Sequence, residues 1–151
     1  MRASFQQAFT VIELIFVIVI IGILSAIAVP RFADSANAAY TAKAASVVTS
    51  VMASLSAERQ KRILRGDYTN ITSLGESTYA FSKFSADGQG NQHDVLSPYI
   101  DKCSGSAKAC WLRSGTSYTY RFADSGSADF ILRNNRLECN NDAADCKKLI
   151  K

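Results

Sequence analysis

The chain has 151 residues, the size of one compact domain, and a formal net charge of +4 at pH 7. This mild surplus is well short of the concentrated basic charge of a nucleic-acid-binding domain, so a nucleic-acid partner is not expected. The sequence carries no patterned nucleophile, no paired carboxylates on a regular element and no phosphate-binding glycine motif, so an enzyme is not expected either.

The first element in chain order is an apolar run over residues 9–29, which is long enough to cross a bilayer as a helix. Its single charged side chain is the carboxylate of Glu13. A charge in hydrocarbon costs at least about 2.5 kcal/mol on the mildest insertion scales, so Glu13 is expected to have a function and a charged partner. The alternative is that Glu13 lies close enough to the membrane surface to reach water.

A cleaved secretory signal is a second interpretation of this segment, because Ala26, Ile27 and Ala28 form a small-x-small cleavage site. The run is longer than a usual signal core, and Glu13 would weaken its insertion without any benefit to a discarded peptide. These features favour a retained anchor. The rival from another class of function is a secreted, disulfide-bonded binding module released after Ala28.

The string AFTVIE at residues 8–13, with the apolar stretch after it, resembles the N-terminus of type IV prepilins and type II secretion pseudopilins. The resemblance implies cleavage between Ala8 and Phe9 by a prepilin peptidase, which also N-methylates Phe9. Glu13 then becomes the fifth mature residue, where the family keeps a glutamate, and Pro30 the twenty-second, where many members carry a helix-kinking proline. The residue before the cut is usually Gly, so Ala8 is a departure, although it is also small.

Cleavage before Phe9 would create a cationic amine at a helix N-terminus, with Glu13 one turn further along. When such helices stack with an axial offset, the amine of one subunit can meet the carboxylate of its neighbour. A broken buried ion pair costs about 3 to 5 kcal/mol, so this pairing would enforce register between subunits. Phe9 and Glu13 are therefore the predicted filament-assembly residues.

Apolar residues continue at helical spacing after the run, and no Gly or Pro occurs between residues 32 and 65. The pattern predicts one helix from about Phe9 to about Leu64, ended by Gly66 and Asp67. Gly22 and Pro30 interrupt its first half and are predicted sites of helix flexibility.

A basic cluster lies near the C-terminus of this helix and is typical of a solvated helix end, where cations complement the helix dipole. Contact with anionic lipid, DNA or an acidic neighbouring subunit is the alternative. The cluster comprises Arg59, Lys61, Arg62 and Arg65.

Residues 66–106 are rich in Gly, Ser, Asn and Asp, which predicts a connecting region with one short helix or strand over residues 78–84. Its only histidine, His93, is expected to be solvated. Four strands follow, at residues 109–113, 117–122, 128–133 and 136–139. They predict an antiparallel meander whose apolar face, with Tyr118, Tyr120 and Phe122 alternating, packs on the helix. The helical partners are Val47, Val51 and Leu55, and further sheet residues are Trp111, Phe130 and Leu132.

Four cysteines form two pairs of identical spacing, which suits disulfides better than zinc and indicates an oxidising compartment. We favour the two local pairings, Cys103 with Cys110 and Cys139 with Cys146, because short closures form easily, while a crossed pairing stays open. No cofactor or metal is predicted, with one alternative: calcium in the last loop. That loop contains Asn140, Asn141, Asp142 and Asp145.

The expected fold is α+β, a pilin-like roll in which one long N-terminal helix packs on a C-terminal antiparallel sheet. The expected segments are a leader (1–8), a transmembrane and assembly half-helix (9–30), an amphipathic half-helix (31–65), a connecting region (66–106), and the sheet with the disulfide-bonded loop (107–151).

The resemblance implies a structural subunit of a type IV pilus-like filament. The alternatives are a type II secretion pseudopilin, acting as a piston for protein export, and a minor pilin for DNA uptake. The implied partners are identical or homologous pilin subunits, the prepilin peptidase and N-methyltransferase, the inner-membrane assembly platform, and membrane lipid before assembly. The implied location is the bacterial inner membrane with the C-terminal domain in the periplasm, then an extracellular pilus or a periplasm-spanning pseudopilus.

Overall fold

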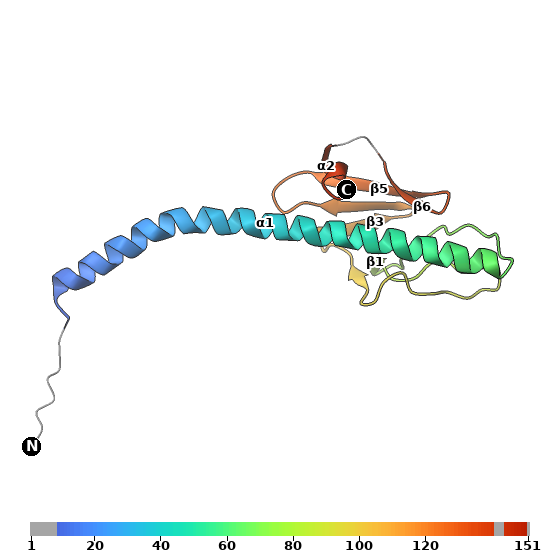
Figure 1. The fold of residues 1–151 in the computed structure, drawn as a ribbon, viewed down its shortest axis with the longest axis horizontal. Helices are drawn as coiled ribbons and strands as arrows, with labels where there is room; N and C mark the ends of the chain where they lie inside the picture. Colours follow the sequence, from blue (N-terminus) through green and yellow to red (C-terminus); the bar gives the residue numbers. More distant parts are fainter. Residues whose placement is uncertain (1–8, 141–143, 151) are drawn as a thin grey trace, which may run out of the picture. The chain divides into compact units, whose positions relative to one another are not determined.

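A computed structural model describes residues 9–140 and 144–150. One long helix, α1 (Val11–Leu64), precedes two small strands, β1 (Tyr79–Phe81) and β2 (Ile100–Asp101) (Figure 1). A four-stranded sheet and a one-turn helix follow: β3 (Cys110–Ser114), β4 (Ser117–Arg121), β5 (Ser127–Arg133), β6 (Arg136–Cys139) and α2 (Ala144–Lys147). This order confirms the predicted α+β class. The chain divides into two compact units between Ala36 and Asn37, which are described separately below.

Both ends of α1 are set by local capping. Thr10 is the N-cap: its hydroxyl accepts a hydrogen bond from the Glu13 amide at 3.3 Å, and its carbonyl accepts one from the Leu14 amide at 3.2 Å. At the other end Gly66 has a φ of 73°, a left-handed conformation that suits glycine. The amides of Gly66 and Asp67 bond back to the carbonyls of Ile63 and Arg62, both at 2.9 Å. This Schellman arrangement ends the helix where the sequence predicts.

The larger sheet is an antiparallel meander in the order β3-β4-β5-β6, as predicted. Asn134 and Asn135, with φ of 51° and 60°, form the two-residue turn between β5 and β6, in the mirror-image geometry that matches strand twist. Strand β3 begins one residue later than predicted, because Ala109 has a left-handed φ of 55° and cannot join the ladder. The other predicted strands agree with the observed ones to within one residue at each end.

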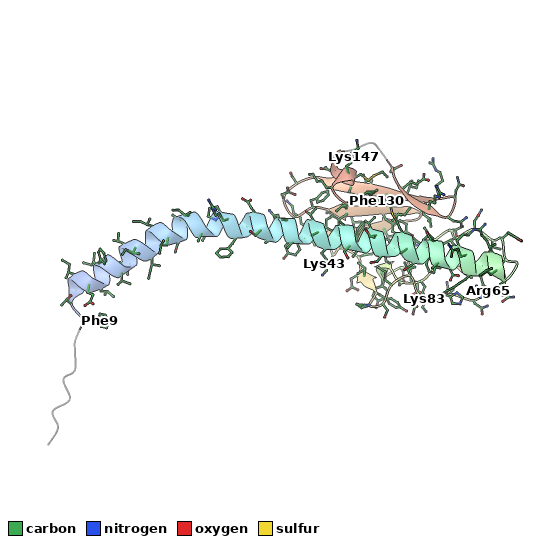
Figure 2. The ribbon with its side chains drawn as sticks, viewed as in Figure 1. Phe9, Lys43, Arg65, Lys83, Phe130 and Lys147 are labelled. Atoms are coloured by element: carbon green, nitrogen blue, oxygen red, sulfur yellow. A yellow bond between two sulfur atoms is a disulfide. The ribbon has the colours of Figure 1, made fainter. Side chains whose placement is uncertain are left out.

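The core of the second unit lies between α1 and the apolar face of the sheet (Figures 1 and 2). Helix positions Val51 and Leu55 are buried as predicted, whereas Val47 is half-buried and its neighbour Val48 is fully covered. The predicted sheet residues are all buried: Trp111, Tyr118, Tyr120, Phe122, Phe130 and Leu132. The aromatic rings of the sheet therefore fill the core.

The connecting region contributes more to this core than its polar composition suggests. Strand β1, within the predicted 78–84 element, pairs antiparallel with β2, a strand that the sequence analysis did not predict. Phe81 stacks on Tyr118 with ring centroids 5.0 Å apart, and the Tyr118 hydroxyl accepts a hydrogen bond from the Leu74 amide at 2.8 Å. Six apolar residues of the region are buried: Ile71, Leu74, Ala80, Phe81, Phe84 and Val95.

The prediction of a solvated basic cluster at the helix end is wrong for Arg62. Its side chain is fully buried, with Nε 3.0 Å from the carboxylate of Glu58, which is itself buried. Its Nη2 donates to the carbonyl of Ser85 at 2.6 Å, so this arginine joins the helix to the connecting region. Arg62 is buried because its i, i+4 spacing from Glu58 lets the two charges pair, and because the connecting region folds over both side chains. Lys61 is exposed as predicted.

The buried carboxylate of Glu58 has further polar neighbours, and we call Glu58, Arg62, Arg65, Asp87 and His93 together the Glu58 cluster. His93 Nδ1 lies 3.2 Å from its Oε1, and Arg65 Nη2 lies 4.0 Å from the same atom. Arg65 also lies 3.4 Å from the buried carboxylate of Asp87. The side chain of His93 is therefore only 42% exposed, contrary to the expectation, because its ring lies against the buried carboxylate of Glu58.

Both disulfides have the favoured local pairing. Cys103 bonds to Cys110, with Cα atoms 5.4 Å apart, and Cys139 bonds to Cys146, with Cα atoms 6.2 Å apart. The first closes the loop before β3, and the second ties α2 to the end of β6. Asn141 and Asp142, on which the calcium alternative depends, lie outside the described residues.

Candidate assembly site on the N-terminal helix

The two predicted assembly residues, Phe9 and Glu13, lie four positions apart at the start of α1. Phe9 is 81% exposed and directly precedes the Thr10 cap (Figure 2). Glu13 lies in the first helical turn, where the helix dipole stabilises a negative charge. Cleavage before Phe9 would therefore put a new amine about one helical turn from the carboxylate. Ala8, the other residue of the predicted cleavage site, lies outside the described residues.

The apolar half of α1 has no cover from the rest of the described chain. Its large side chains are between 41% and 77% exposed from Val11 to Val29. An 18-residue window reaches a mean hydropathy of 3.0 with none of its residues buried, so the helix is long and apolar enough to cross a membrane. The core helix of a soluble protein would be covered, whereas the exposed apolar surface of this segment fits a membrane anchor.

Gly22 and Pro30 both lie inside α1, which continues through them. Pro30 has no amide hydrogen to donate to the carbonyl one turn earlier, so the helix lacks one backbone hydrogen bond there. A Cβ atom at Gly22 would meet nothing within 4 Å, so the chain itself gives no packing reason for a glycine at this position. Their role in helix flexibility stays a prediction.

The comparison with known families identifies this N-terminal segment. Residues 4–29 match the model of the prokaryotic N-terminal methylation motif. This motif is the hallmark of type IV pilins and pseudopilins, so the N-terminal segment has the type that the resemblance of residues 8–13 indicated, and the match supports a pilin-type protein. No curated protein and no solved structure matches the chain.

The motif has implications for how the protein is processed and where it is anchored. It implies processing by a prepilin peptidase and assembly into a pilin filament, and together with the exposed apolar helix it fits a membrane anchor that later enters a filament. The pilin type is structural and non-enzymatic. The match ends at residue 29, so the properties of the C-terminal domain follow from its own residues.

Sequence reasoning missed the polar centre of the C-terminal domain, the Glu58 cluster. One signal was available, because Glu58 precedes Arg62 by four residues, the better orientation for a helical ion pair. The contributions of Asp87 and His93 were not accessible, because they depend on how the connecting region folds back on the helix.

Proposed function

We propose that this protein is a structural subunit of a type IV pilus-like filament. The precursor is stored in the inner membrane, cut between Ala8 and Phe9, N-methylated at Phe9, and assembled through α1. The observation that supports this most strongly is an acid in the first turn of an uncovered apolar helix, inside a segment that matches the methylation motif.

The proposed mechanism of assembly follows from two charges at one end of that helix. Before assembly, the new amine of Phe9 and the carboxylate of Glu13 lie near the membrane surface and partly compensate each other. In the filament, the apolar faces of α1 exchange lipid for neighbouring helices. A subunit in correct register pairs its amine with the Glu13 of its neighbour, and a subunit out of register leaves buried charges unpaired, at a cost of about 3 to 5 kcal/mol.

Orientation in the membrane is proposed from the cysteines. Two disulfides suit an oxidising compartment, which places the C-terminal domain in the periplasm and the short N-terminal head in the cytoplasm. Charge gives little help, because Arg2 precedes the apolar run and Arg31 follows it.

The methylation motif is shared by pilins and by the pseudopilins of type II secretion, so a piston for protein export is the second candidate. The two disulfides favour a pilus subunit, because major pseudopilins commonly lack them. The test is to express the chain with each type of assembly machinery, and to compare surface pili seen by immunogold labelling with restored export of a secreted substrate.

The processing step has a direct test in the mass and N-terminal sequence of the mature protein. We expect the chain to begin with N-methylated Phe9 when it is expressed with a prepilin peptidase, and to stay uncut without it. Ala8→Gly, which restores the usual residue, should be cut at least as fast, whereas Ala8→Glu should block cleavage by filling a small subsite with a charge. A mature chain that begins at Val29 would instead support the secreted binding module.

A further inference from the structure

A hollow with a volume of about 580 Å³ lies at one end of the four-stranded sheet. Its walls are the disulfide loop before β3 and the connection between β4 and β5. No carboxylate side chain lines it within the part of the chain that the structure describes. The lining residues are Gly105, Ser106, Lys108, Arg121, Phe122, Ser125, Gly126 and Ser127.

The two cations of this hollow are held in place by neutral groups. Lys108 Nζ donates to the carbonyl of Asp124 at 2.7 Å, and Arg121 Nη1 donates to the carbonyl of Gly105 at 2.8 Å. Neither side chain forms an ion pair with another described residue. Within the described residues, no carboxylate therefore lies at ion-pair distance from either side chain, and each has further N–H donors that these bonds do not use.

Two carboxylates lie nearby among the residues that the structure describes, and the described cations outnumber them. Asp145, next to Gly126, is paired with Lys148 at 2.7 Å. The pKa of Asp124 is lowered, mainly by a hydrogen bond from the Ser125 amide and less by Lys148 and Lys108, so this group is charged. The three cations Lys108, Arg121 and Lys148 thus lie near two carboxylates, those of Asp124 and Asp145. Asp145 is already paired with Lys148, which does not line the hollow.

The walls are fixed by covalent and backbone bonds before any ligand arrives. The Cys103–Cys110 disulfide closes the first wall, and the Cys103 amide bonds to the carbonyl of Trp111 at 2.7 Å. In the second wall, the Phe122 amide bonds to the carbonyl of Gly126 at 3.2 Å. Such preorganisation lowers the entropic cost of binding.

We propose that this hollow binds the phosphate group of a ligand. A planar guanidinium, an ammonium and serine hydroxyls around a glycine-rich surface supply the donors that a tetrahedral oxyanion accepts. The volume exceeds that of a bare phosphate and leaves room for the part of the ligand that carries it. The proposal does not depend on which filament the chain joins, so its failure would leave the assembly proposal unaffected.

The test uses the full chain in a neutral detergent, titrated with inorganic phosphate and followed by calorimetry. We expect saturable binding that weakens by about tenfold in Arg121→Gln, because a charge-assisted hydrogen bond is lost. The matched control is Arg133→Gln, which removes the same charge from an exposed site on β5 that does not line the hollow, and should leave the affinity unchanged. Unchanged emission of Trp111, the only tryptophan, verifies the fold of each variant.

A second variant separates the hollow from general surface charge. Ser106→Phe keeps both cations but fills the space, so it should abolish binding. A labelled single-stranded DNA then distinguishes the sources of phosphate: competition with inorganic phosphate identifies a phosphodiester polymer, and its absence identifies a small phosphorylated ligand. No saturable phosphate binding, or an equal loss in Arg121→Gln and Arg133→Gln, would overturn the proposal.

Discussion

Two glutamates of the same helix show how the surroundings of a carboxylate define its role. Glu58 is buried and finds a cation within the chain, because Arg62 Nε on the same helix lies 3.0 Å from its Oε1. Glu13 lies on an exposed apolar segment, and among the described residues no cation lies within ion-pair distance of it. The first acid has its partner within the domain, whereas we propose that the second finds its partner only after processing and assembly.

The role of Glu58 leads to a stability prediction for Arg62→Met. The substitution keeps the apolar stem but leaves a buried carboxylate with weaker compensation, and we expect a loss of about 3 kcal/mol in the free energy of unfolding. The control, Lys61→Met, alters the adjacent exposed cation and should change the stability by less than about 0.5 kcal/mol. Urea unfolding followed by Trp111 fluorescence measures both, and equal effects would show that the buried pair has no special role.

At the scale of elements, sequence patterns predicted what depends on neighbours along the chain. The glycine at 66 predicted the helix end, and the alternation of Tyr118 and Tyr120 predicted a sheet with one buried face. Strand β2 was not predicted, because it has two residues and is held by tertiary bonds such as that from the Lys102 amide to the Thr78 carbonyl at 3.3 Å.

The two candidate sites also differ in how far the sequence can predict them. The spacing of Phe9 and Glu13 predicts the assembly site, both residues lie within the matched methylation motif, and their role in assembly stays a prediction. The hollow beside Arg121 could not be predicted, because its two walls meet only after the disulfide loop and the β4–β5 connection fold together.

The carboxylate of Asp67 leads to a prediction of how the stability depends on pH. Asp67, just beyond α1, accepts hydrogen bonds from the amides of Gly88 at 2.9 Å and Thr69 at 2.8 Å. These bonds, that from Gly88 most of all, lower the pKa of Asp67 from 3.8 to about 2. Because the folded pKa is below the unfolded one, the stabilisation is present above pH 4 and is lost as the pH falls towards 2.

Asp67→Asn should therefore lower the melting temperature at neutral pH, and the difference from the unsubstituted protein should shrink as the pH falls from 4 towards 2. The measurement is thermal unfolding by circular dichroism at several pH values. A difference that stays constant between pH 7 and pH 2 would contradict the assignment of these two hydrogen bonds.

At the scale of the whole molecule, the chain combines a unit with its own core and a unit without one. The second unit buries its aromatic sheet face and closes both disulfides within itself. The first unit exposes a long apolar helix, a surface that suits lipid or other helices. This division suits a subunit that folds before it assembles, with assembly adding contacts to the helix.

The central claim is that Glu13 aligns neighbouring subunits through the amine of Phe9. The most direct test is to express the chain and Glu13→Ala with a complete assembly machinery, and to count filaments by electron microscopy. We expect Glu13→Ala to enter the membrane and fold as well as the unsubstituted chain, yet to form no filaments. Normal filaments from Glu13→Ala would contradict the account.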